Sequence, residues 1–194
     1  MKNAIILHGK PDKEEYYSLD QPNPSNRHWI PWLQKQLLVH DIKADTPEVP
    51  QPYKPRWDLW VKEVERFEIG PETILVGHSC GAGFWVKYLS LYSSLRVGKV
   101  VLVAPWLGED YGAPATNFFD SYKIDTDMVK RTKGTIIFHS DDDKEAINTA
   151  VQQLRELLKG AEYKEFHGYG HFTYQDMKTT EFPELLEECL LGSL

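Results

Sequence analysis

TILVGHSCGAG, residues 73–83, is the stretch that decides the fold. An apolar run leads into a Gly-x-Ser-x-Gly turn centred on Ser79, and a helix-like pattern follows. A strand-to-helix turn this sharp needs small flanking residues, here Gly77 and Gly81, and it leaves the serine hydroxyl exposed at its tip. The backbone N–H of Cys80, at the start of the helix, is expected to point toward a developing oxyanion. The pattern predicts a nucleophilic serine, against the alternative of a tight turn that holds serine by chance.

A nucleophilic serine requires a base and an acid that orients the base, and both have candidates downstream. SDDD, residues 140–143, follows an apolar run, and His171 lies in a glycine-containing loop after the last strand-like segment. The order along the chain is serine, aspartate, histidine, as expected for a nucleophile on a strand–turn–helix architecture. All three follow the carboxyl ends of predicted strands, where open parallel sheets carry their sites.

Composition indicates an ordinary globular protein. The 194 residues, 41% hydrophobic and 26% charged, suit one domain, expected to span residues 1–194. The net charge of −7 argues against nucleic acid and anionic membranes as partners. No signal-peptide core or membrane-spanning run is found, and Cys80 and Cys189 give no disulfide framework, so the cytoplasm is the expected location.

Apolar runs and amphipathic patterns alternate along the chain, which is typical of an α/β fold with right-handed crossovers. Strands are expected at residues 4–7, 73–76, 100–103 and 135–138, with weaker candidates at 42–45 and, as an edge strand, 161–166. Helices are expected near residues 29–37, 57–67, 82–89, 147–158 and 183–190. Two long loops, 10–27 and 105–123, start at carboxyl ends of strands and are expected to lie over the site.

With these residues in place, the chain resembles the α/β-hydrolase superfamily. More narrowly, it resembles the compact, nearly lidless serine hydrolases of the retinoblastoma-binding-protein-nine type. The segments that carry the resemblance are ILHG (6–9), WIPWL (29–33), Trp57 with Trp60, VGHSCG (76–81), AP (104–105), SDDD (140–143) and GHF (170–172). The resemblance implies a three-layer α/β/α sandwich around a mostly parallel six-stranded sheet, with the nucleophile after the third strand. It also implies hydrolysis of esters or related acyl bonds, with no cofactor. Because little lid is expected, the site should be shallow and favour small or short-chain esters.

Two departures from the family's pattern bear on the site. Members often carry Ser-x-Asp-Asp-Pro where this chain has three aspartates followed by Lys144, so the acid has three contiguous candidates. Matching the serine places the acid at Asp143, with Asp142 in reserve. The first strand is followed by Lys10 and Pro11 instead of a glycine-rich segment. Because proline lacks an N–H, the second oxyanion donor is expected to be the amide of Lys10.

Four further residues are expected to contact the substrate. His8 and Gly9 end the first strand, and Trp106 and Phe118 lie in the second long loop. His8 has an alternative interpretation as a packed or hydrogen-bonded core histidine. His78, inside the turn, is expected to point away from the tip and to be structural.

The leading hypothesis from the sequence is acyl transfer to water through an acyl-Ser79 intermediate. No His-x-His or His-Glu-x-x-His spacing is present, so no metal is expected. Two alternatives stay open, a protein-binding module that keeps the fold without turnover and a serine peptidase or acyltransferase. The expected partner is a small-molecule acyl substrate, and the sequence leaves open whether a partner protein gates the loops.

Overall fold

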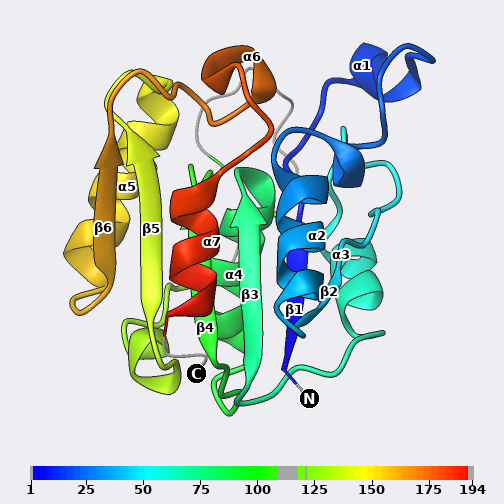
Figure 1. Cartoon of the computed structure of the whole chain (residues 1–194). Coiled ribbons are helices and arrows are strands. Elements are labelled where there is room, and N and C mark those ends of the chain that lie inside the picture. The colour runs from blue at the N-terminus through cyan, green and yellow to red at the C-terminus, as the bar shows by residue number, and fades with distance from the viewer. Residues whose placement is uncertain (1, 109–117, 121, 192–194) are drawn as a thin grey trace.

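A six-stranded parallel sheet forms the centre of the computed structural model, which describes residues 2–108, 118–120 and 122–191 (Figure 1). The strand order is β2-β1-β3-β4-β5-β6, and every neighbouring pair is parallel. The strands are β1 (Asn3–Leu7), β2 (Lys43–Asp45), β3 (Thr73–His78), β4 (Lys99–Val103), β5 (Thr135–Ser140) and β6 (Glu162–Phe166). The six expected strands are therefore confirmed, and β6 is an edge strand as predicted.

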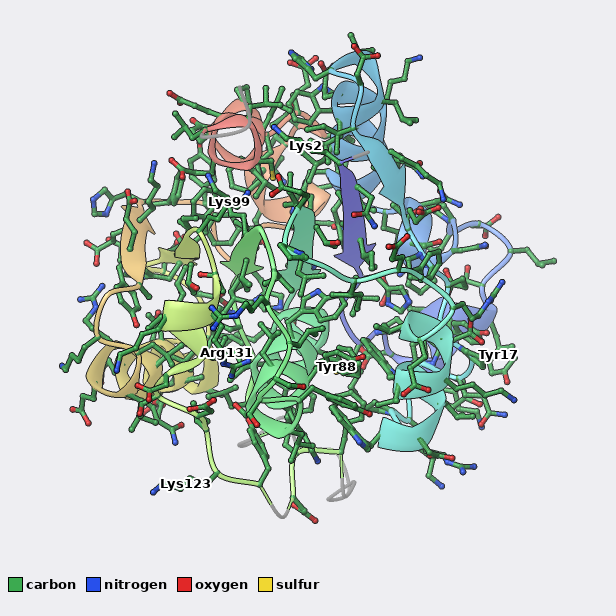
Figure 2. All side chains as sticks on the ribbon, turned by 90° about the horizontal axis from the view of Figure 1, so that it is seen from below. Lys2, Tyr17, Tyr88, Lys99, Lys123 and Arg131 are labelled. Atoms are coloured by element: carbon green, nitrogen blue, oxygen red, sulfur yellow. The ribbon has the colours of Figure 1, made fainter. Side chains whose placement is uncertain are left out.

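Helices cover both faces of the sheet, so the predicted three-layer sandwich is confirmed. The helices α2 (Ile30–Val39) and α7 (Pro183–Leu190) lie on one face. The other face carries α3 (Trp57–Val64), α4 (Cys80–Leu91) and α5 (Glu145–Leu157). Figure 2, seen from below, shows the sheet between these two groups. None of the helices in the described residues is long and apolar enough to cross a bilayer.

Burial explains why these segments adopt these structures. Every residue of β3 and of β5 is buried, which fits continuous apolar runs covered on both faces. The helix α5 buries one stripe of its surface, Ile147, Val151 and Leu154, at the spacing of one helical face. Trp29, Trp60 and Trp85 are wholly inaccessible and form part of the hydrophobic core between the sheet and its helices.

The first long loop contains short structure that the sequence pattern did not indicate. Residues 10–27 include α1 (Lys13–Tyr17) and the 3-10 turn Pro24–Asn26. The first turn of α1 is held locally, because the N–H of Asp12 donates to Glu15 Oε2 at 3.3 Å. A second short helix, α6 (Tyr174–Met177), begins at the capping residue Thr173. Both helices are too short to produce an apolar periodicity, and both lie above the carboxyl ends of the strands (Figure 1).

The second long loop is only partly described, because residues 109–117 and 121 lie outside the described residues. Its returning segment is held against α4. The ammonium group of Lys87 donates to the carbonyl oxygens of Phe118, at 2.7 Å, and Asp120, at 3.0 Å. The same ammonium lies 4.6 Å from the centre of the Trp57 ring. This part of the loop is therefore anchored to the helical layer.

Candidate active site

Ser79 occupies the turn between β3 and α4 in a conformation that a non-glycine residue rarely adopts, with φ +54° and ψ −112°. Such a residue costs of order 1–3 kcal/mol and persists only where its surroundings hold it. The surroundings here are backbone hydrogen bonds: the N–H of Ser79 donates to Val103 O at 2.9 Å, and its carbonyl accepts from Gly83 and Trp106. The side chain is thereby fixed at the end of β3, 7% exposed.

The two glycines of the turn allow backbone to touch backbone. A Cβ on Gly77 would lie 2.5 Å from the nitrogen of Ala82. A Cβ on Gly81 would lie 2.6 Å from the carbonyl oxygen of His8 and 2.7 Å from that of Leu7. These distances are too short for any side chain, which confirms the predicted close approach.

His171 and Asp143 meet directly at the carboxyl end of the sheet. The Nδ1 atom of His171 lies 3.0 Å from one carboxylate oxygen of Asp143 and 2.9 Å from the other. The Asp143 side chain is inaccessible, and the imidazole keeps 16% of its surface exposed. Because an ionised carboxylate only accepts, Nδ1 carries the proton, which leaves Nε2 free to accept one.

The three consecutive aspartates have three different partners. Asp141 binds the exposed His167 at 2.7 Å and raises the pKa of that imidazole. Asp142 accepts from the hydroxyl of Ser140 at 2.5 Å and from an N–H of the next loop, and these bonds lower its pKa. Among the described residues, Asp143 is the aspartate of this run that contacts His171.

The loop that carries His171 is fixed on both sides of the histidine. Its N–H donates to Asp176 Oδ2 at 3.0 Å, and its carbonyl accepts from Nε2 of His78 at 2.8 Å. The flanking residues Gly170 and Phe172 have positive φ angles of +49° and +55°. The hydrogen bond from His78 therefore links the backbone of His171 to the residue that directly precedes Ser79.

Ser79 and His171 border one cavity of about 360 Å³. Its wall is formed mostly by polar side chains from the segments at and after the carboxyl ends of β1, β3, β4, β5 and β6. The lining residues are Gly9, Lys10, Pro11, Asp12, Glu15, Pro24, Arg27, His28, His78, Ser79, Trp106, Lys144, His171, Thr173 and Gln175.

Two of the four residues expected to contact substrate line this cavity, Gly9 and Trp106, and two do not. His8 is 1% exposed, and both its ring nitrogens are engaged, with Val49 N–H donating to Nε2 and Nδ1 donating to Gly9 O. His8 therefore fits its alternative interpretation, a hydrogen-bonded core histidine. Phe118 is wholly buried against Trp60, with ring centres 5.2 Å apart, because the anchored loop turns it toward the helices.

The structure adds two histidines that the sequence interpretation left out of the site. His78 lines the cavity instead of pointing away from it, and its ring centre lies 5.1 Å from that of His171. Burial, reinforced by His171, lowers the pKa of His78 well below its usual range. His28 accepts a hydrogen bond from Tyr174 N–H at 3.1 Å, and burial beside Arg27 lowers its pKa to about 4. No local motif marks His28, because its partner lies 146 residues away.

The two expected oxyanion donors are open. Among the described residues, no backbone or side-chain oxygen accepts from the N–H of Lys10 or of Cys80. Cys80 is the first residue of the twelve-residue helix α4, where N–H groups have no partner within the helix. Lys10 lines the cavity beside Gly9, whose position for a Cβ lies 3.2 Å from the Ser79 Cβ. No group of three or more His, Cys, Asp or Glu side chains in the described part of the chain could hold a metal ion.

The comparison with known families agrees with this geometry. The family described as "Serine hydrolase" matches residues 21–187, which include Ser79, Asp143 and His171. The chain belongs to the serine hydrolase family. Among sequences, it is 27% identical over 189 residues to YdeN of Bacillus subtilis (strain 168), named as a hydrolase, with 94% of this chain and 91% of YdeN covered.

Solved structures share the fold of this serine hydrolase. The structure of the B. subtilis ydeN gene product superposes with a TM-score of 0.78 at 23% identity, covering 100% of this chain and 98% of that one. Est1E from Butyrivibrio proteoclasticus, solved with ferulic acid bound, gives a TM-score of 0.65 at 15% identity, covering 99% and 89%. The predicted α/β-hydrolase architecture is thus confirmed by structures as well as by topology.

Proposed function

We propose that this serine hydrolase is a carboxylesterase that cleaves small acyl esters through an acyl-Ser79 intermediate. His171 serves as the general base and Asp143 as the acid that orients it. The proposal covers one catalytic domain, residues 1–194, and needs no cofactor. Within the family, the proposal extends to the retinoblastoma-binding-protein-nine type, which the sequence motifs resemble.

In the first half of the reaction, Nε2 of His171 removes the hydroxyl proton as Ser79 Oγ attacks the carbonyl carbon of the ester. Asp143 fixes the tautomer and stabilises the imidazolium. The carbonyl oxygen becomes an oxyanion, which the open amides of Cys80 and Lys10 stabilise by about 3 kcal/mol per donor. His171 then gives its proton to the departing alcohol.

In the second half, water replaces the alcohol. His171 removes a proton from the water as it attacks the acyl carbon, a second oxyanion forms and collapses, and the proton returns to Ser79 Oγ. The products are a carboxylic acid and the free enzyme.

One observation carries the proposal: His171 contacts both oxygens of an inaccessible Asp143 while its ring borders the same cavity as the strained Ser79. The Ser79 hydroxyl makes no side-chain hydrogen bond within the described residues, so it is available to the base. In enzymes without substrate, the hydrogen bond between a catalytic hydroxyl and its base is often long, and it shortens when substrate binds.

A fluorophosphonate probe tests the proposal, because it reacts covalently with activated serines. The wild-type protein should be labelled on the peptide that contains Ser79, and Ser79→Ala should not be labelled. Ser94→Ala, an exposed serine in a loop, is the matched control and should label like the wild type. A wild-type protein that resists the probe, or a Ser79→Ala variant that still reacts, would contradict the proposal.

A further inference from the structure

A second hollow, of about 310 Å³, adjoins the cavity that holds Ser79. Four residues line both spaces: Glu15, Arg27, His28 and Gln175. The second hollow, here called the side hollow, is otherwise formed by Gln21, Pro22, Asn26, Pro31, Trp32, Tyr174 and Thr180. The two spaces are therefore neighbours, bordered in common by these four residues.

The position of the side hollow indicates which half of an ester would enter it. Tyr174 and Gln175 belong to the segment that follows His171, whereas Trp106 follows β4 and lines only the catalytic cavity. His171 must donate its proton to the departing alcohol, so the alcohol lies on the histidine's side of the reacting carbon. The acyl group then lies toward Trp106, and the side hollow faces the alcohol.

The charges around the side hollow cancel. The guanidinium group of Arg27 pairs with the carboxylate of Glu15 and donates to two backbone carbonyl oxygens, those of Pro22 and Glu15. Arg27 is only 6% exposed, so its charge stays with that partner. His28 accepts a hydrogen bond from Tyr174 N–H through Nδ1, so it is a neutral ring in this arrangement. The hollow therefore suits an uncharged ligand.

The side chains of the side hollow combine flat apolar surfaces with hydrogen-bonding groups. Trp32 and Tyr174 supply aromatic rings, and Tyr174 is 51% exposed. Three amides and a hydroxyl, those of Gln21, Asn26, Gln175 and Thr180, supply both donors and acceptors. A ring with C–H faces and a rim of hydroxyl groups matches this combination, whereas a plain hydrocarbon ring would leave the amides without ligand partners.

We propose that the side hollow binds a neutral polyhydroxylated ring, a sugar or a cyclic polyol, as the alcohol half of the ester. This inference rests on the proposed esterase function and names the substrate class of that same site. The reaction it describes is the removal of a small acyl group from a sugar hydroxyl, giving the free sugar and a carboxylic acid.

Three acetates with the same acyl group test the inference: 6-O-acetylglucose, ethyl acetate and phenethyl acetate. Acetate release should show kcat/KM for the sugar ester at least about tenfold above that for ethyl acetate, since a site built for hydroxyl groups discriminates against alcohols that lack them. Phenethyl acetate should fall below the sugar ester, because its ring offers no hydroxyl groups.

Variants then assign the preference to the side hollow. Tyr174→Ala removes an exposed ring and should lower the ratio of the sugar ester to ethyl acetate by about fivefold. Gln21→Ala should lower the same ratio. Tyr92→Ala, at the end of α4 and outside both spaces, is the matched aromatic control and should leave the ratio unchanged.

The outcomes separate the two proposals. Hydrolysis of the simple acetates with no preference for the sugar ester, or a ratio that Tyr174→Ala and Gln21→Ala both leave unchanged, would overturn the side-hollow inference while keeping the esterase. A preference for phenethyl acetate would overturn it as well, in favour of an apolar ring. If the protein cleaved none of the acetates and was not labelled by the fluorophosphonate probe, the proposed esterase function itself would be contradicted.

Discussion

The two ends of the sheet carry hollows of equal size, about 360 Å³ each, but their chemistry differs. Figure 2 looks onto the amino end, where Lys2 and Lys99 lie beside this hollow. The ammonium group of Lys99 donates to the carbonyl oxygens of Glu188 and Leu191, at 2.5 and 2.7 Å, and Lys133 pairs with Glu72. At the carboxyl end, a serine hydroxyl and two backbone amides have no acceptor among the described residues.

Backbone conformation separates the ends in the same way. Of the residues that line the carboxyl-end hollow, the non-glycine residues His28 and Ser79 have positive φ angles, of +57° and +54°. Among the described residues that line the amino-end hollow, Gly160 alone has one. Size therefore does not mark the functional site, whereas backbone strain at non-glycine residues and open polar groups do.

The largest loss of activity should come from removing one oxygen atom, the Oγ of Ser79, at the carboxyl end. Ser79→Ala should lower kcat for p-nitrophenyl acetate by about 10⁴-fold or more, because the nucleophile is lost. Lys133→Ala, at the exposed rim of the amino-end hollow, should leave kcat unchanged. Equal losses in the two variants would erase the functional difference between the ends.

Asp143→Asn should produce the next largest loss, about 10³- to 10⁴-fold in kcat, because an amide can hold His171 in the wrong tautomer. Asp142→Asn is the matched control, since Asp142 bonds to Ser140 and the Gly170 N–H instead of His171. It should cost less than about tenfold, acting only through the loop. If Asp142→Asn lost activity and Asp143→Asn did not, Asp142 would be the acid instead of Asp143.

A third comparison concerns stability and uses two glycines. Gly81→Ala would bring a methyl group against two carbonyl oxygens of the β1 end and should lower the free energy of unfolding by about 3 kcal/mol. Gly70, before β3 at the amino end, has open space around it. Gly70→Ala should change that free energy by less than about 1 kcal/mol. Urea denaturation of both variants measures the difference, and similar values would contradict the close packing of the turn.

The smallest effect is a pH dependence of stability that arises at the carboxyl end. Because burial lowers the pKa of His28 to about 4, the unfolded chain binds more protons than the folded one between that value and about 6.5. The free energy of unfolding should therefore fall as the pH drops from 6.5 to 5, by about 1 kcal/mol after allowance for solvent around the partly exposed ring.

His28→Asn should flatten this dependence, and Asn tolerates the positive φ angle of +57° at that position. The buried His78 acts in the same direction, so part of the slope should remain. Urea denaturation at several pH values, with wild type and variant side by side, measures the slopes. An unchanged slope in His28→Asn would assign the acid sensitivity to other groups.

Local signals account for what the sequence could predict. The strands β1, β3, β4 and β5 are continuous apolar runs. The turn at Ser79 is predicted by eleven consecutive residues, 73–83. The strands β2 and β6 give weaker signals in the sequence, and the loose alternation of side chains in residues 161–166 predicts an edge strand. The helices α1 and α6 were not predicted because each is too short to produce an apolar periodicity and is held by local hydrogen bonds.

Long-range contacts account for what the sequence left open. Three adjacent aspartates look alike along the chain, and only the pairing of Asp143 with a histidine 28 residues away separates it from Asp142. His8 and Phe118 were placed near the substrate by position, but their side chains are buried by contacts with Val49 and Trp60. Arg27 and His28 reach the cavity from a polar loop that carries no motif.

The hydrogen bond from His78 to the carbonyl of His171 joins positions 93 residues apart, one beside the proposed nucleophile and one at the proposed base. A nascent chain that has left the ribosome only as far as β5 and its following turn already holds Ser79 and Asp143 but lacks their partner. Under the proposed mechanism, such a chain is inert. Activity would then begin only once β6 and the loop after it have folded, so that unfinished chains pose no hydrolytic hazard to the cell that makes them.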